Sequence, residues 1–130
     1  MAGLLSSGKE ALVKDEYKAI APRLPPIAYK IASVYGAWVV GGACLESNPK
    51  DVDLMVPLNQ WYLAAPLVPA SARPTVFGGW KWVEGDITVD CWPDSLSRLV
   101  TRIRFQAAYS PSTGTMLIPQ TILPAKRRKQ

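Results

Sequence analysis

Histidine is absent from this sequence of 130 residues, and cysteine occurs only twice. The absence of histidine excludes Ser-His-Asp and Cys-His catalysis, histidine general bases and zinc sites that use histidine. Cys44 and Cys91 stand apart without a CxxC pair, which excludes a zinc knuckle and a dense disulfide framework. We interpret both as buried, reduced thiols of a cytoplasmic protein, with a single disulfide between them as the alternative.

Charge is also scarce, since charged residues make up 19% of the chain and hydrophobic residues 48%. This balance is typical of a chain that buries a core. The length suits one domain, expected over residues 1–125 with a basic tail over 126–130. No signal peptide is evident, and three prolines interrupt the uncharged stretch 54–72. We therefore expect no membrane span, no membrane partner and a cytoplasmic location.

Acidic residues are absent from residues 95–130. The same segment holds the basic residues Arg98, Arg102, Arg104, Lys126, Arg127, Arg128 and Lys129. Such a basic end can attract polyanions, which makes nucleic acid a possible partner. The alternative is a solvated helix face followed by a solubilising tail, because a short basic cluster alone is weak evidence for nucleic-acid binding.

Hydrophobic patterning and turn residues predict a mixed domain. Helices are expected over 9–21, 27–34 and 93–105, with a helical turn over 58–65 and a connector over 66–74. Strands are expected over 37–40, 51–56, 75–83 and 86–92, the last two as a hairpin, with two short strands around the turn 110–114. The fold class is therefore α/β (α+β), a small mixed β-sheet with helices mainly on one face.

Two short motifs near the middle of the chain are candidates for chemistry. The expected strand 37–40 runs into Gly41 and Gly42, where the backbone can approach a phosphate closely; a simple tight turn is the alternative. Asp51 and Asp53 alternate with apolar residues, so a strand would direct both carboxylates to one side. Two adjacent like charges favour a divalent cation such as Mg²⁺ or Mn²⁺, unless both are merely exposed at a strand end.

A third acid, Asp90, lies inside the otherwise apolar strand 86–92. An unpaired acid in such a place is unfavourable, which indicates a nearby metal ion or cationic side chain. Asp86 shares its side of the strand but lies beside the turn, where solvation is expected.

Together, the glycine pair, the Asp51-Val52-Asp53-Leu54 segment and Asp90 occur in the order found in one known group of enzymes. Residues 37–93 resemble the nucleotidyltransferase superfamily of DNA polymerase β, CCA-adding enzymes and minimal nucleotidyltransferases. The segment from Gly41 to Asp53 is most similar to the CCA-adding branch, and the strand around Asp90 to the X-family polymerases. The spacer is shorter than usual, the Arg-Asp pair that often follows the glycines is missing, and the chain has no room for helical domains that grip nucleic acid.

The resemblance implies a nucleotidyltransferase-like core that transfers a nucleoside monophosphate from an NTP or dNTP to a hydroxyl group. It implies two Mg²⁺ or Mn²⁺ ions, with Asp51 and Asp53 on both and Asp90 on the ion beside the attacking hydroxyl. Gly41 and Gly42 would bind phosphates through their N–H groups, and Ser47 and Lys50 lie on a loop that could reach a phosphate. The acceptor could be RNA, DNA, a protein or a small molecule, and the basic end favours an anionic one.

Several residues and functions stay open at this point. Trp80 and Trp82 could stack a base, although packing is expected more strongly, while Trp38 and Trp61 are assigned to the core. Lys81, Arg98 and Arg102 could neutralise phosphate charge. The alternatives to an enzyme are a module that binds nucleotide or nucleic acid without turnover, and a small structural or accessory subunit with an apolar interface over 54–72.

Overall fold

The computed structural model describes residues 23–46 and 48–119. Its strands are β1 (Trp38–Val40), β2 (Asp51–Pro57), β3 (Arg73–Pro74), β4 (Trp80–Glu84), β5 (Ile87–Asp94), β6 (Ala108–Ser110) and β7 (Thr115–Leu117). Its helices are α3 (Pro26–Tyr35), α4 (Trp61–Ala64) and α5 (Leu96–Arg102), with short 3-10 helices η2 (Gly42–Leu45), η3 (Leu58–Gln60) and η4 (Ala65–Leu67).

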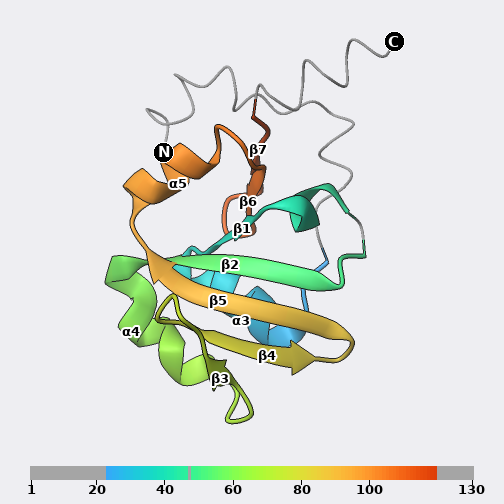
Figure 1. Ribbon diagram of the computed structural model, residues 1–130, viewed down its shortest axis with the longest axis vertical. Coiled ribbons are helices and arrows are strands. Elements are labelled where there is room, and N and C mark those ends of the chain that lie inside the picture. Colours follow the sequence, from blue (N-terminus) through green and yellow to red (C-terminus); the bar gives the residue numbers. More distant parts are fainter. Residues whose placement is uncertain (1–22, 47, 120–130) are drawn as a thin grey trace.

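The described strands form one mixed sheet in the order β3-β4-β5-β2-β1-β6-β7 (Figure 1). Strands β2 and β5 are parallel, and the other neighbours are antiparallel. The described residues therefore have an α+β fold with a mixed sheet, which confirms the fold class at this level.

One face of the sheet is covered by α3 and α4, which both contact β2. Helix α3 lies behind β2 and β5 in Figure 1. Its buried residue Ile31 packs in one core cluster with Val52 and Leu54 of β2 and Val89 of β5. The start of α3 is held at the end of β4, because the Ile27 N–H donates to Glu84 Oε2 at 2.7 Å.

The opposite face is only partly covered. Leu99 of helix α5 and Ile103, which follows the helix, are buried in a second cluster with Val40 and Met55 of the sheet. This cluster occupies the β1–β6–β7 side and the later halves of β2 and β5. The earlier halves of β2 and β5, where the three aspartates lie, are left outside this second core.

The helix α5 begins at a well-defined cap. The Ser95 hydroxyl accepts a hydrogen bond from the Arg98 N–H at 3.3 Å. We expect Ser95→Ala to lower the free energy of unfolding by about 1 kcal/mol, because an unpaired N–H is then left at the first turn. Urea denaturation followed by circular dichroism measures this loss, and an unchanged midpoint would show that the cap is dispensable.

Most predicted elements are found, with changes at their ends. The helix over 27–34, the strands over 37–40 and 51–56, the hairpin and the two strands around 110–114 are confirmed. The expected strand 75–83 begins only at Trp80, and Arg73 and Pro74 form a short strand within the expected connector. The expected helix 93–105 is found in shorter form as Leu96–Arg102. It begins later than expected because Pro93 and Asp94 continue the pairing of β5 with β2, and it ends at Arg102.

The expected helix 9–21 and the basic tail 126–130 lie outside the described residues. Over the ranges 23–46 and 48–119, no helix has the length and apolar character needed to cross a membrane. The uncharged stretch 54–72 instead supplies most of β2 and the short helices η3, α4 and η4.

Candidate functional site

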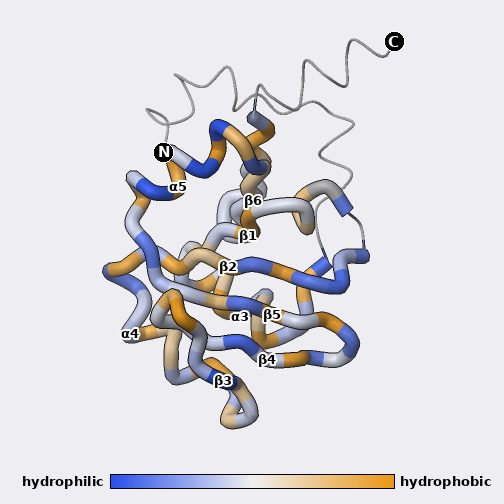
Figure 2. The backbone as a smooth tube through the Cα atoms, viewed as in Figure 1, coloured by the Kyte–Doolittle hydropathy of each residue, from blue (hydrophilic) through white to orange (hydrophobic). Residues whose placement is uncertain are grey.

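Strand β2 has two different sides, as its alternating sequence predicts. Val52 and Leu54 are fully buried against the helices, while Asp51 and Asp53 are exposed on the other face. Hydrophilic and hydrophobic segments alternate along β2 in Figure 2. The two carboxylates therefore lie on one face of the sheet, and they are held there by the burial of the alternate residues.

The parallel pairing of β2 with β5 brings the third acid to the same place. Asp53 is directly opposite Asp90, and Asp51 is opposite Thr88. Directly paired residues project from the same face of a sheet. The structure thus collects the three predicted aspartates on one face of two neighbouring strands.

The charges of Asp53 and Asp90 are held in an unfavourable environment. Although the Asp53 side chain remains accessible, partial loss of hydration raises the pKa of its carboxyl, and the neighbouring charge of Asp90 raises it further. Burial also raises the pKa of the Asp90 carboxyl. Both carboxylates would be stabilised by an additional positive charge.

One atom of this group lacks a hydrogen-bond partner. Among the described residues, Asp90 Oδ1 is buried and makes no hydrogen bond. A buried, unpaired carboxylate oxygen beside a second carboxylate fits a cation that binds oxygen ligands. The described residues nevertheless contain no cluster of three or more Cys, Asp or Glu side chains that could hold a metal ion as they stand.

Two cationic side chains act on these acids. Lys81 of β4 is paired with Asp90, and its positive charge offsets part of the increase in the pKa of both Asp90 and Asp53. The guanidinium of Arg102 lies 5.2 Å from the centre of the Trp92 ring, and its charge lowers the pKa of Asp53. Arg98 forms an ion pair with Asp94 at 3.6 Å instead. Lys81 and Arg102 are therefore the two predicted cations that influence the acids.

Gly41 lies beside the acids at the end of β1. It has a φ of +89°, which favours glycine, and a Cβ there would lie 3.8 Å from Asp53 Oδ2. Its N–H donates to the Ala107 carbonyl at 2.9 Å, so this N–H is engaged within the fold. Gly42 begins η2, and the predicted phosphate contact of the glycine pair stays a prediction.

Ser47 and Lys50 are the two loop residues predicted to contact phosphate. Ser47 lies outside the described residues. Lys50 is exposed and lines a pocket of about 180 Å³ together with Arg23 and Asp86, and none of the three aspartates lines that pocket. The proposed phosphate contact of Lys50 stays a prediction.

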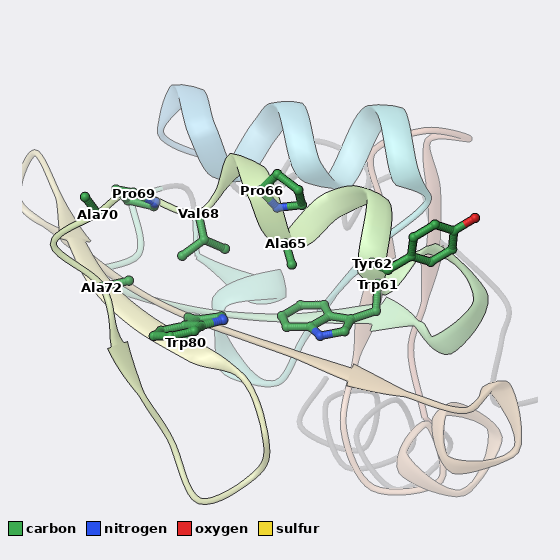
Figure 3. Close-up of a pocket in the computed structure, with 9 residues that line it drawn as sticks. All are labelled: Trp61, Tyr62, Ala65, Pro66, Val68, Pro69, Ala70, Ala72 and Trp80. Atoms are coloured by element: carbon green, nitrogen blue, oxygen red, sulfur yellow. The ribbon is translucent and has the colours of Figure 1, made fainter.

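The tryptophans are arranged for packing. Trp38 and Trp82 are buried, as is Trp92. Trp80 and Trp61 are partly buried and line a pocket of about 570 Å³ on the helix-covered side, where Figure 3 shows their rings on the same side of the pocket. The remaining lining is mainly alanine, proline and valine: Tyr62, Ala65, Pro66, Val68, Pro69, Ala70 and Ala72. This pocket contains no carboxylate, lysine or arginine.

Phe77 is an aromatic residue that the sequence patterns did not single out. It is 67% exposed in the connection between β3 and β4, and its ring centre lies 6.3 Å from that of Trp92. Trp92 follows Asp90 by two residues on the same side of β5. Phe77 is therefore an exposed aromatic ring on the acid-bearing face, whereas Trp80 and Trp82 pair with Cys91 and Val89 and project from the other face.

The two cysteines take no part in this arrangement. Both are free and buried, as predicted, and burial raises the pKa of each thiol to about 12. The Cys44 thiol donates a hydrogen bond to the Val39 carbonyl at 3.0 Å. Neither thiol would ionise near neutral pH, which excludes both as thiolate nucleophiles.

The assembled site is a pair of adjacent acids with a third acid on the same face, flanked by a glycine on one side and a lysine on the other. Comparisons with models of protein families, with curated proteins and with solved structures find no match for this chain.

Proposed function

We propose that this protein is a metal-dependent nucleotidyltransferase that transfers a nucleoside monophosphate from an NTP or dNTP to a hydroxyl group. The observation that carries the proposal is the pairing of Asp53 with Asp90 across β2 and β5, with Asp51 on the same face. Three acids in two neighbouring strands, beside a glycine turn, are the arrangement that the resemblance in the sequence implies.

Asp51, Asp53 and Asp90 would hold the Mg²⁺ or Mn²⁺ ions. The raised pKa values of Asp53 and Asp90 and the unpaired Asp90 Oδ1 support this assignment, because bound cations would relieve both features. When bound, such ions polarise phosphate oxygens and lower the pKa of a coordinated hydroxyl.

Two residues of the chain are assigned to the proton of the acceptor hydroxyl and to the negative charge of the phosphates. The acceptor hydroxyl oxygen bonds to the α-phosphorus, the bond from that phosphorus to the bridging oxygen breaks, and pyrophosphate leaves. In this assignment the Asp90 carboxylate lies beside the attacking hydroxyl and would accept its proton as a general base. The positive charge of Arg102 beside Asp53 offsets part of the negative charge that the phosphates bring.

The phosphates of the nucleotide are assigned to the β1–η2 side of the acids. The Cβ-free backbone of Gly41 leaves the space beside Asp53 open. Gly42 begins η2, and the first N–H groups of a helix have no partner within that helix. The leaving pyrophosphate would therefore lie over Gly42, on the opposite side of the acids from Lys81.

Incorporation of label tests the proposal directly. Each NTP and dNTP, labelled at the α-phosphate, is incubated with the protein and Mg²⁺ or Mn²⁺ against RNA, a DNA primer–template and a cell lysate. We expect label on one class of acceptor with wild-type protein and no label with Asp51→Asn. Folded protein that binds NTP but labels nothing would contradict the enzyme and favour a binding module.

A further inference from the structure

The acids belong to a longer row of side chains that crosses the sheet. Val40, Asp53, Asp90, Lys81 and Arg73 are each the direct partner of the next, on β1, β2, β5, β4 and β3. All five therefore project from the same face. The side chains along this row are first apolar, then acidic and then basic. The two basic residues, Lys81 and Arg73, therefore follow directly on the two acids.

The basic end of the row lines a pocket of about 640 Å³. Lys81 and Arg73 are both exposed there, at the edge of the sheet where β3 is the last strand. Ser71 and Thr88 add hydroxyl groups, and Asp51 adds one carboxylate on the side toward the site. The complete lining is Asp51, Ser71, Arg73, Lys81, Trp82, Val83 and Thr88. Two cations and two hydroxyls in one open pocket suit a phosphate group.

The position of this pocket relative to Asp90 indicates which substrate it serves. Neighbouring strands lie about 5 Å apart, so the backbones of Lys81 and Arg73 are about 5 and 10 Å from that of Asp90. The β1–η2 turn at Gly41 and Gly42, the side to which the proposed function assigns the nucleotide phosphates, lies on the other side of Asp53. The pocket is therefore on the side from which the acceptor hydroxyl would reach Asp90.

We propose, resting on the proposed function, that Arg73 and Lys81 bind a phosphate group of the acceptor next to its reactive hydroxyl. The acceptor is then a phosphate-bearing molecule, and an uncharged protein hydroxyl does not fit this pocket. Two classes of acceptor carry such a phosphate group: a nucleic-acid strand with a free terminal hydroxyl, and a small phosphorylated sugar. Arg73 is the more informative residue to change, because Lys81 also acts on the pKa values of the acids.

Equilibrium binding separates this pocket from the nucleotide side and from turnover. Fluorescence anisotropy gives Kd values of wild-type protein and Arg73→Gln for a labelled single-stranded RNA oligonucleotide and for labelled ATP, both with Mg²⁺. Unlabelled ribose 5-phosphate and inorganic phosphate serve as competitors against the oligonucleotide. Lys30→Gln is the matched control, because Lys30 is exposed on α3 on the opposite side of the sheet.

We expect Arg73→Gln to weaken oligonucleotide binding about tenfold and to reduce its salt dependence by about one phosphate contact, while binding of ATP is unchanged. Lys30→Gln should change neither. Competition by ribose 5-phosphate at a concentration where inorganic phosphate has no effect would identify the small acceptor; no competition would identify the nucleic-acid strand.

Three results would overturn the inference: equal oligonucleotide binding by wild-type protein and Arg73→Gln, an equal loss of ATP binding, or no binding of either phosphorylated ligand by wild-type protein. Thermal melting checks that the variant is folded. A wrong proposed function would give a different result. No label would be incorporated, while Arg73→Gln would still bind the oligonucleotide more weakly than wild-type protein does.

Discussion

Asp53→Asn is expected to lower the rate of nucleotidyl transfer by about 10³-fold or more. Asp53 is central in the candidate site, since it is paired with Asp90 on one side and lies beside Gly41 on the other. Asparagine keeps the size of the side chain but removes its charge, so ligand binding is lost while the sheet is preserved. The measurement is the initial rate of label incorporation with the acceptor that wild-type protein uses.

Asp86→Asn is the matched control for this change. Asp86 is an exposed acid in the turn between β4 and β5, outside the group of Asp51, Asp53 and Asp90. The control should keep the wild-type rate, and both variants should give wild-type circular dichroism spectra. A wild-type rate in Asp53→Asn would remove Asp53 from the reaction and, with it, the pairing on which the proposed function rests.

The parts of the fold that follow local patterns could be predicted from the sequence. Alternation along β2 separates Val52 and Leu54 from Asp51 and Asp53, because only one side of the strand can be buried. The hairpin of β4 and β5 follows from two apolar runs across a glycine turn. These patterns act over a few residues, so they can be recognised without knowledge of the remaining chain.

The parts that depend on pairing between distant segments could not be predicted. No local signal shows that β2 pairs in parallel with β5, and this pairing is what places Asp53 against Asp90. The same applies to Arg73, whose two-residue strand exists only because it pairs with Lys81 at the edge of β4. The three acids could therefore be recognised from their sequence pattern, while the adjoining row of cations appears only once the sheet is formed.

The aromatic residues show a second limit of prediction from the sequence. Trp80 and Trp82 alternate with small and charged residues, which is equally compatible with an exposed platform and with packing. Trp82 is 3% exposed because its side of β4 is covered by the first core cluster. Phe77 instead lies exposed on the acid side, in a connection whose path depends on the close packing of Gly79 against the Cys91 carbonyl.

Asp90→Asn is expected to stabilise the metal-free protein at neutral pH. Burial raises the pKa of Asp90, so the folded state holds this proton more tightly than the unfolded chain does. Stability therefore falls as the pH rises from the ordinary carboxylate range through the raised pKa. Asparagine does not ionise, and in the presence of a chelator it should raise the free energy of unfolding at pH 7 by about 1 kcal/mol, a value kept small because solvent screens the partly exposed carboxylate.

The difference in free energy of unfolding between wild-type protein and Asp90→Asn should depend on pH and on Mg²⁺. A difference caused by packing alone would depend on neither. Denaturant titrations with a chelator should show the advantage of the variant at pH 7 and its loss as the pH falls below the ordinary carboxylate range, where Asp90 is protonated in the folded and the unfolded protein. Excess Mg²⁺ should stabilise wild-type protein alone, because an ion that binds only the folded state shifts unfolding by mass action. If the variant is less stable than wild-type protein at pH 7 with chelator, Asp90 makes favourable contacts as an anion within the fold. Its unpaired oxygen would then be no argument for a bound cation.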